Sequence, residues 1–259
     1  IRAGMDIAQR RVPQDGHIAI AYEGETIHMR VSTLPTVYGE KCVIRLMQRD
    51  ENLHTLASLG FDEVALAALS RATRAPQGML LVTGPTGSGK TTTLHAALTD
   101  INRPQINIVT LEDPVESQIA GINHVDTGGQ GSVTFASGLR SILRQDPDVV
   151  FIGEMRDNEV TNIGVKAALT GHLVLSTLHT NSAAAALTRL ADMGVAPYLL
   201  ADALLLVVAQ RLVRKVCEAC VQPIAPTAPE AAEFGLTDEQ LAGAAMQKGA
   251  GCPCCMDSG

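Results

Sequence analysis

Apolar and polar residues alternate along the first fifty residues, in the pattern of half-buried β-strands. The alternation covers residues 17–22 and 26–31, and the polar residues 23–25 between them can form a turn. A third apolar segment follows at residues 42–47. A period of two places the apolar side chains on one face of a sheet. We therefore predict a β-rich N-terminal unit, which ends at the polar residues 48–52.

From residue 58 onward, short apolar segments alternate with segments of helical periodicity. The apolar segments have the length of strands buried on both faces of a parallel sheet, and they are residues 79–83, 106–111, 148–152 and 173–178. The helical segments are residues 90–101, 137–143, 159–169 and 182–193. A helix before the first of these strands is predicted to bury Leu59, Val64, Leu66 and Leu69. The repeat of strand and helix predicts an α/β core around a parallel sheet.

Polar residues follow each of the four core strands at its carboxyl end. In chain order they are residues 84–91, Glu112 with Asp113, Gly153 with Glu154, and His179. The carboxyl ends of parallel strands meet at one edge of the sheet, and ligands bind at that edge. The sequence therefore predicts one ligand site built from all four segments.

The glycine-rich segment at residues 84–91 matches the phosphate-loop pattern in full. Its glycines let backbone N–H groups point at phosphates, while Lys90 would reach the β and γ phosphates and Thr91 would bind Mg²⁺. The alternative is a chance glycine turn, but a strand precedes the segment and a helix follows it. We assign binding of Mg-ATP to Gly84, Pro85, Thr86, Gly87, Ser88, Gly89, Lys90, Thr91 and Thr92.

The acidic residues after the second core strand are candidates for the chemistry of hydrolysis. A carboxylate is needed to orient the attacking water or to accept its proton. Glu112 is the candidate because it comes first after the strand, and Asp113 and Glu116 remain alternatives. An ordinary helix N-terminus lined with acids would also explain these residues.

The third core strand resembles a Walker B strand with one departure. Gly153 occupies the position that usually carries Asp, so Glu154 is predicted to act near Mg²⁺. At the end of the fourth strand, His179 can contact the γ-phosphate or a bridging water. His172 begins that strand at the opposite edge and is predicted to be structural. A structural role is the alternative for His179 as well.

Two Cys-x-x-Cys pairs lie in the last part of the chain. Each pair can hold a metal ion from a tight turn, and four thiolates complete a tetrahedral structural zinc site. The predicted ligands are Cys217, Cys220, Cys252 and Cys255. Cys254 could replace a member of the second pair only with poorer spacing. Disulfides are the alternative, which the reducing compartment of an ATP consumer disfavours.

Composition and charge narrow the range of partners. The chain has 259 residues, of which 46% are hydrophobic, and a formal net charge of -7. Its longest basic stretch is residues 211–215, so we expect no direct nucleic-acid partner. The apolar run at residues 203–209 is shorter than the roughly 18 residues that cross a bilayer. We therefore expect a soluble, cytoplasmic chain. Because it begins with Ile1 rather than Met, we interpret it as a fragment of a longer protein.

The motifs together resemble the secretion ATPase superfamily, and most of all the type II secretion and type IV pilus assembly ATPases. The resemblance covers the whole chain and includes residues 11–16, 30–41, 140–148, 153–157 and 176–181. It implies a RecA-like P-loop core, preceded by a small α+β domain and followed by a zinc-binding tetracysteine element. The domain boundaries we predict are 1–48 for the β-rich, PAS-like domain, 49–57 for a linker, 58–215 for the core and 216–259 for the zinc element.

The same resemblance implies the site residues and their roles. Residues 112–116 would be the Asp box, Glu154 the Walker B acid, and His179 part of the His box. Arg30 and Arg45 are the candidates for stabilising charge on the γ-phosphate, because arginines of the β domain reach the nucleotide in related motors.

The resemblance also implies a working assembly. In it, a homo-hexamer hydrolyses Mg-ATP between neighbouring subunits, and domain rotation drives pilin or pseudopilin assembly. The implied partners are an inner-membrane platform and docking proteins, through which the chain would associate peripherally with the membrane. A docking domain would precede Ile1 and a helical region would follow Gly259.

Two other functions remain as alternatives at this stage. One is a nucleic-acid translocase on the same core, as in DNA uptake or conjugation, which the acidic balance and few aromatic residues disfavour. The other is a scaffold that binds ATP and hardly turns it over, which the intact set of catalytic residues disfavours. The sequence leaves open whether the machine served is a secretion system or a pilus.

Overall fold

The computed structural model describes residues 1–22, 25–47, 54–127, 133–224, 235, 237, 240 and 246–259. It divides into two compact units, Ile1–Arg211 and Leu212–Gly259. Among the described helices, none combines the length and the apolar character needed to cross a membrane. The linker predicted at 49–57 lies largely outside the described residues.

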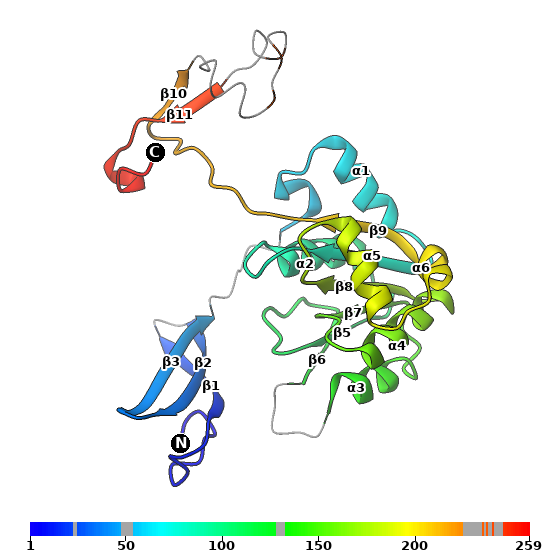
Figure 1. Ribbon diagram of the computed structural model, residues 1–259, viewed down its shortest axis with the longest axis horizontal. Coiled ribbons are helices and arrows are strands. Elements are labelled where there is room, and N and C mark those ends of the chain that lie inside the picture. Colours follow the sequence, from blue (N-terminus) through cyan, green and yellow to red (C-terminus); the bar gives the residue numbers. More distant parts are fainter. Residues whose placement is uncertain are drawn as a thin grey trace. The chain divides into compact units, whose positions relative to one another are not determined.

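The N-terminal part of the chain forms a three-stranded antiparallel sheet (Figure 1). Its strands, in spatial order, are β1 (Gln14–Tyr22), β2 (Glu25–Thr36) and β3 (Gly39–Met47). The three predicted strands are present and are longer than the alternation indicated. The described residues up to Met47 contain no helix, so this part is β-structure where an α+β domain was expected.

The core is built on a six-stranded, fully parallel sheet with the order β6-β5-β7-β8-β4-β9 (Figure 1). The strands are β4 (Gly78–Thr83), β5 (Ile108–Glu112), β6 (Asn123–Asp126), β7 (Val149–Ile152), β8 (Leu173–Leu178) and β9 (Leu204–Ala209). The four predicted strands are present, and the α/β class with a parallel sheet is confirmed. The edge strands β6 and β9 were not predicted, because β6 is short and mostly polar and β9 follows a helix without a turn signal.

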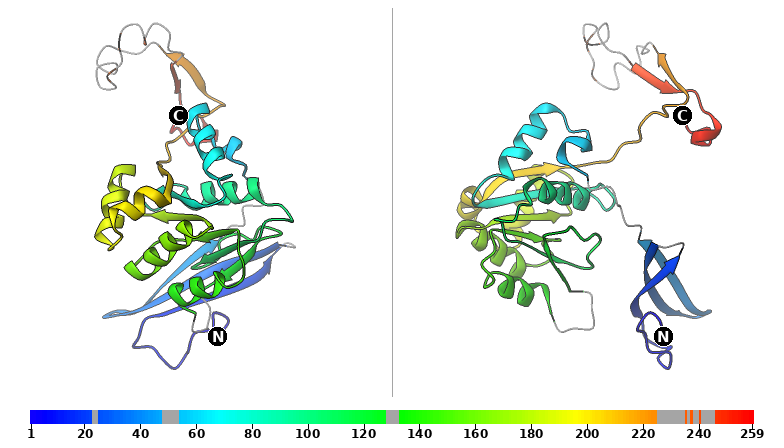
Figure 2. Two further views of the ribbon diagram at one scale, coloured as in Figure 1. Left: turned by 90° about the vertical axis from the view of Figure 1, so that its right-hand side faces the viewer. Right: turned by 180° about the vertical axis from the view of Figure 1, so that it is seen from behind.

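Helices cover both faces of this sheet (Figure 2). The helical elements are η1 (Leu56–Leu59), α1 (Glu63–Ala72), α2 (Lys90–Ile101), α3 (Phe135–Ile142), α4 (Asn158–Leu169), α5 (Ala183–Asp192) and α6 (Pro197–Ala203). One face packs against α1 and α2, and its core includes Leu80, Phe151 and Leu94. The other packs against α3 to α6, around Leu81 and Val160. This two-sided burial explains why the central strands are continuously apolar.

Local capping sets the starts of three core helices. The side chains of Thr134, Asp157 and Ser182 accept hydrogen bonds from the third residue of α3, α4 and α5, respectively. Such caps satisfy backbone N–H groups that the first turn leaves free. For α1 the prediction was partly wrong, because Val64 is 81% exposed whereas Leu69 is buried. The two residues are five positions apart, which places them about 140° apart around the helix.

The second unit contains a short antiparallel pair of strands. They are β10 (Val221–Ile224) and β11 (Met246–Gly249), with Val221 opposite Gly249. A single turn, η2 (Pro253–Cys255), follows near the end of the chain. The strand pair and this turn bring the two Cys-x-x-Cys pairs together.

Candidate functional site

The phosphate loop connects β4 to α2, as its sequence predicted. Lys90 is the first residue of α2, and the glycines before it have positive φ angles, 76° at Gly87 and 81° at Gly89. Gly84 also has a positive φ, and a Cβ there would collide with the carbonyl oxygen of Gln210. Conformation therefore favours glycine at all three positions, and at Gly84 the lack of space requires it as well.

Lys90 points back into the loop that carries it. Its Nζ donates hydrogen bonds to the carbonyl oxygens of Gly84 and Pro85, each at 3.0 Å. Burial lowers the pKa of the Lys90 ammonium, while the charge of Glu154 raises it. A cation partly removed from water favours an anionic partner. The ammonium thus lies where it would meet phosphate oxygens held by the N-terminus of α2.

The unpredicted strand β9 also supports the phosphate loop. Gln210, the residue after β9, donates from its backbone N–H to Thr83 at 2.8 Å. Its side chain donates to the carbonyl of Ser88 and accepts from the hydroxyl of Thr93, both at 2.8 Å. The adjacent Arg211 donates to the carbonyl of Asn181 at 3.1 Å. Gln210 and Arg211 therefore connect the loop, α2 and the segment after β8.

Glu112 ends β5 and is buried between two histidines. Its Oε2 lies 3.3 Å from Nε2 of His95 on α2, and its Oε1 lies 3.1 Å from Nδ1 of His124 on β6. Burial by itself would raise the pKa of Glu112, but hydrogen bonds from His124, His95 and Thr110 together lower it to about 2. Glu112 is therefore ionised throughout the neutral range.

The remaining predicted acid, Glu154, lies in a cluster around Arg156 at the end of β7. Arg156 pairs with Glu154 and donates to Asp113 at 2.9 Å, and its guanidinium lies 5.0 Å from the ring centroid of Phe135. Nε2 of His179 lies 3.4 Å from the other oxygen of Glu154. The structure thus brings Asp113, Glu154 and His179 together through an arginine that we had not assigned to the site.

Gly153, which occupies the usual Asp position of a Walker B strand, lies close to the end of β5. Its backbone N–H donates to the carbonyl of Leu111 at 2.8 Å. A Cβ at this position would lie 3.3 Å from that carbonyl oxygen and 3.5 Å from Cα of Glu112. A larger residue would make a tight contact here, which a small shift of β5 or β7 could relieve.

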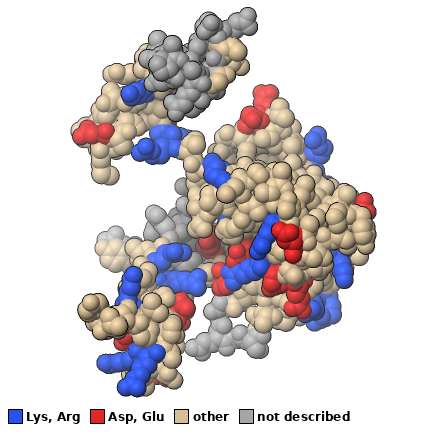
Figure 3. Space-filling model, viewed as in Figure 1, with Lys and Arg blue, Asp and Glu red and all other residues tan. Residues whose placement is uncertain are grey.

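Arg30 and Arg45 lie directly opposite each other on β2 and β3. His17 on β1 is opposite Arg30, so the three residues form a row across the sheet. Like charges on directly paired strand positions repel each other. All three side chains are exposed, and the two paired arginines form a basic surface suited to an anion. Elsewhere, Figure 3 shows acidic and basic side chains next to one another on the visible face of the core.

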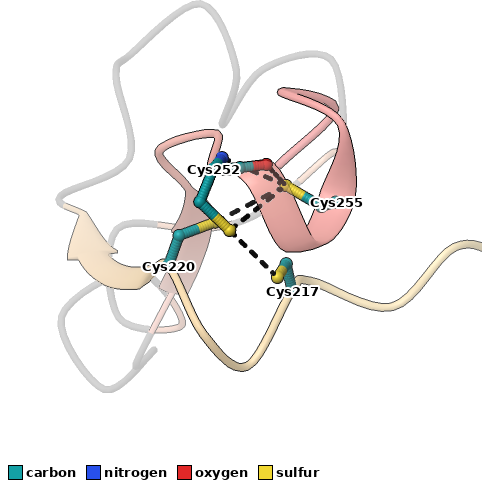
Figure 4. Close-up of side chains that lie close together, drawn as sticks. All are labelled: Cys217, Cys220, Cys252 and Cys255. Atoms are coloured by element: carbon teal, nitrogen blue, oxygen red, sulfur yellow. Dashed lines mark hydrogen bonds between the residues drawn. The ribbon is translucent and has the colours of Figure 1, made fainter.

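The four predicted zinc ligands form one cluster (Figure 4). The sulfurs of Cys217 and Cys252, and those of Cys220 and Cys255, are 3.9 Å apart, and those of Cys252 and Cys255 are 3.7 Å apart. A tetrahedral zinc ion with Zn–S bonds of about 2.3 Å separates its sulfurs by about 3.8 Å. A disulfide would need about 2.0 Å. The spacing therefore fits a metal ion and not two disulfides, and Cys254 is exposed and does not belong to the cluster.

Backbone groups favour thiolate formation in this cluster. The N–H groups of Gly259 and Cys252 donate to Sγ of Cys255 at 3.3 and 3.2 Å, and these bonds lower the pKa of the Cys255 thiol to about 6. Burial raises the pKa of Cys220 to about 11. Metal binding displaces protons from all such ligands. The donor set therefore fits Zn²⁺, with Cys255 deprotonated most readily.

The sequence did not predict three residues of these sites. His95 falls on the predicted helix 90–101, but no motif marks it. His124 lies on an unpredicted strand. Arg156 stands inside the segment 153–157 that carries the family resemblance, so its position was the available signal. These residues become recognisable only when separate elements meet.

Comparisons with known proteins agree with this arrangement. A family profile described as Type II/IV secretion system protein matches residues 1–259. Type II secretion system protein E of Dickeya dadantii (strain 3937) is 50% identical over 100% of this chain and 51% of its own length. The type IV pilus assembly ATPase PilB of Myxococcus xanthus (strain DK1622) is 48% identical over 100% of this chain and 46% of its own length. The chain thus spans about half the length of the curated relatives it matches.

Solved structures share the fold. The crystal structure of the pilus retraction motor PilT with bound ADP superposes with a TM-score of 0.68 and 31% identity, covering 80% of this chain and 61% of that one. This likeness extends the agreement from sequence to the three-dimensional arrangement of the strands and helices.

Acid conditions provide a test of the Glu112 contacts. The pKa of Glu112 in the folded protein is about 2, against an ordinary value of 4.5. Because the pKa of Glu112 is lower in the folded than in the unfolded protein, its contacts stabilise the fold fully at pH values above about 4.5. This stabilisation is lost as the pH falls from about 4.5 toward 2. The difference corresponds to roughly 3 kcal/mol, of which about 2 kcal/mol should be lost by pH 3.

Denaturant unfolding of the core at pH 6 and pH 3 measures this loss. Glu112→Gln has no carboxylate to titrate, so its unfolding free energy should fall by about 2 kcal/mol less than that of the parent over this interval. An equal fall in the two proteins would contradict the contacts described for Glu112.

Proposed function

Because the chain belongs to the type II/IV secretion system protein family, we propose that it is the Mg-ATP-hydrolysing part of a secretion or pilus assembly motor. The observation that carries this proposal is the phosphate loop at the carboxyl end of β4, with Lys90 buried at the start of α2. Glu112 is the last residue of β5, and Glu154 follows the neighbouring strand β7 at the same edge. The membership confirms the resemblance predicted from the motifs, and it disfavours the nucleic-acid translocase.

The proposed roles follow from the position of each side chain. Lys90 and the loop residues 84–92 bind the phosphates, the loop through its backbone N–H groups, which Pro85 alone lacks. Thr91 and Glu154 would hold Mg²⁺, which supplies positive charge to the transferring phosphate when bound. Glu112 orients the attacking water. His179 contacts the γ-phosphate side of the site, where it already neighbours Glu154. Asp113 is less suited to the water because Arg156 engages its carboxylate.

In this proposal Glu154 has two alternative partners, Arg156 and Mg²⁺. Glu154 pairs with Arg156 in the structure, and the bound metal would compete for the same carboxylate. Because the pair is partly exposed, its contribution is small, of the order of 1 kcal/mol or less. Exchange of Arg156 for Mg²⁺ therefore faces no large barrier from this contact.

The assembly around the motor is also proposed from the family. We infer a homo-hexamer in the full-length protein, with Arg30 and Arg45 adding positive charge near the γ-phosphate. Force would pass to an inner-membrane platform that adds pilin or pseudopilin subunits, and docking proteins would hold the chain at the cytoplasmic side. The boundaries 1–48, 58–215 and 216–259 describe the proposed moving parts.

The direct test is release of phosphate from ATP by the purified chain. Turnover should require Mg²⁺ and should stop when the metal is chelated, because the metal neutralises charge on the transferring phosphate. Turnover per chain should rise with protein concentration if sites form between subunits. Absence of Mg-dependent turnover at every concentration would leave the nucleotide-binding scaffold as the better function.

We propose that Cys217, Cys220, Cys252 and Cys255 bind one structural Zn²⁺. Metal analysis of protein purified without added zinc is expected to find one ion per chain. Chelation should unfold mainly the residues beyond Arg211, because they form a separate small unit whose folding depends on the metal. Hydrogen exchange before and after chelation measures this effect.

Cys254 provides the matched control for the zinc prediction. Cys254→Ser should keep the metal, whereas Cys217→Ser should lose it, because only Cys217 belongs to the sulfur cluster. A metal-free protein with an ordered C-terminal unit would contradict the assignment. Loss of zinc from Cys254→Ser but not from Cys252→Ser would show that the ligands are different.

A further inference from the structure

Glu112 is enclosed by side chains from three different elements. Its neighbours are His95 on α2, His124 on β6 and Thr110, two residues earlier on β5. The side chains of His95, His124 and Glu112 are 13%, 8% and 4% exposed. Two strand positions apart, Thr110 and Glu112 share one face of the sheet, which is the face covered by α2.

We propose that His95 and His124 are positioning residues that fix the Glu112 carboxylate as an acceptor for the attacking water. This inference rests on the proposed ATP hydrolysis and on the role of Glu112 in it. It assigns the two histidines no contact with the nucleotide. They act through the orientation and charge of Glu112.

The hydrogen bonds of His124 determine its tautomer. The backbone N–H of Ile119 donates to Nε2 of His124 at 3.0 Å, so Nε2 carries a lone pair. The single ring proton is therefore on Nδ1, which lies 3.1 Å from Oε1 of Glu112 and 2.9 Å from the hydroxyl of Thr110. His124 is thus a neutral donor to Glu112, held in place by backbone on its far side.

His95 approaches the other oxygen of the same carboxylate. Its Nε2 is buried and lies 3.3 Å from Oε2 of Glu112, close enough for attraction although the angles are not those of a well-formed hydrogen bond. The ring packs edge-on against Phe151 of β7, with centroids 5.6 Å apart and planes at 75°. This packing fixes the ring orientation and directs Nε2 toward Glu112.

The position of His95 on α2 links Glu112 to the phosphate loop. Lys90 begins α2, and His95 is five residues further along the same helix, about 7.5 Å along its axis. A helix of this length moves as one body, so His95 ties the carboxylate to the element that would bind the phosphates. The distance between the water-orienting group and the phosphates is then set by a rigid element.

The same contacts decide what Glu112 can do to the water. Proton transfer is most efficient when the pKa of the base is near the working pH. With three donors around it, Glu112 has a pKa of about 2 and is a weak base. Phosphoryl transfer through a loose transition state needs positioning more than proton removal. Glu112 therefore orients the water and does not take its proton before the phosphorus–oxygen bond breaks.

Two substitutions at each histidine distinguish the effect of its N–H donor from the effect of its size. His95→Leu and His124→Leu remove the donors. In His95→Gln and His124→Asn, an amide N–H can replace the Nε2–H and Nδ1–H donors, respectively. Steady-state ATP turnover of the whole chain should then give a kcat at least about tenfold lower in the leucine variants, with KM for ATP within about twofold of the parent. The amide variants should recover most of the lost rate.

The pH profile distinguishes positioning from general structural support. The titratable groups around Glu112 include His95 and His124, and also Asp126, which stands opposite Glu112 on β6 and is unchanged in all the variants. Loss of a donor raises the pKa of the carboxylate. The acid limb of kcat should therefore move to higher pH in the leucine variants and stay near its parental position in the amide variants. A parental kcat and pH profile in both leucine variants would overturn the proposal, as would equal losses in the leucine and amide variants.

Two further variants complete the experiment. If His95→Leu fails to fold by circular dichroism, His95→Asn replaces it, because the shorter amide retains polarity without reaching Glu112. If His124→Leu fails to fold, the comparison of the His95 variants alone decides the test. The Glu112→Gln variant separates this inference from the proposed function. Parental turnover in Glu112→Gln removes the role of Glu112 and the inference with it. An inactive Glu112→Gln beside fully active histidine variants refutes the histidine inference alone.

Discussion

Lys90→Ala is expected to lose ATP turnover altogether and to bind nucleotide far more weakly. Lys90 is the cation held inside the phosphate loop, hydrogen-bonded to Gly84 and Pro85 at 3.0 Å. Alanine leaves the loop without a positive side chain at the β and γ oxygens, and charge-assisted hydrogen bonds to such oxygens are the strong ones. Binding of a fluorescent ATP analogue and release of phosphate measure the two effects.

Glu112→Gln is the matched contrast to this change. The amide has the shape of the carboxylate without its charge, so nucleotide binding should stay close to that of the parent. Turnover should fall by about 10² or more, the loss expected when a reacting group is misplaced by about 1 Å. Hydrolysis at the parental rate by Glu112→Gln would leave Asp113 or Glu116 as the acid. Parental turnover in Lys90→Ala would contradict the whole nucleotide site.

The double variant Arg30→Ala, Arg45→Ala is expected to bind ATP nearly as well as the parent and to hydrolyse it far more slowly. The two arginines are paired across β2 and β3, an arrangement in which their charges repel unless an anion lies between or above them. Arginines fully engaged at a transferring phosphate contribute about 10³ to 10⁵ in rate. We expect a loss in this range in the assembled protein.

Arg10 provides a control for net charge in the same experiment. It lies before β1, outside the paired row, so Arg10→Ala should hydrolyse ATP at the parental rate. Turnover should be compared at several protein concentrations, because engagement of Arg30 and Arg45 depends on assembly. Parental hydrolysis by the double variant would leave the two arginines as surface charges.

The sequence determined the elements whose signals are local. The four central strands of the core were predictable because a parallel strand buried on both faces must be apolar throughout. The phosphate loop was predictable because its positive φ angles and close backbone contacts require glycine at fixed positions. The four cysteines were predictable as a group because two tight Cys-x-x-Cys turns can share a metal.

Contacts between distant segments were decided only by the tertiary structure. β9 has an apolar sequence without a period, and only its pairing with β4 shows that Gln210 supports the phosphate loop. Val64 matched a helical pattern, but the sheet covers only one side of α1 and leaves it exposed. A periodic pattern identifies an apolar face without saying how much of it a neighbour covers.

Glu112 shows most clearly which properties follow from the sequence and which from tertiary contacts. Its place at the end of a predicted strand follows from the sequence, and so does its assignment to the site. Its charge state depends on His95 and His124, which lie 17 residues before and 12 residues after it in the chain. A pKa is set by the groups within a few ångströms and by burial. The sequence therefore identified the acid, and the packing of α2 and β6 against β5 determined its chemistry.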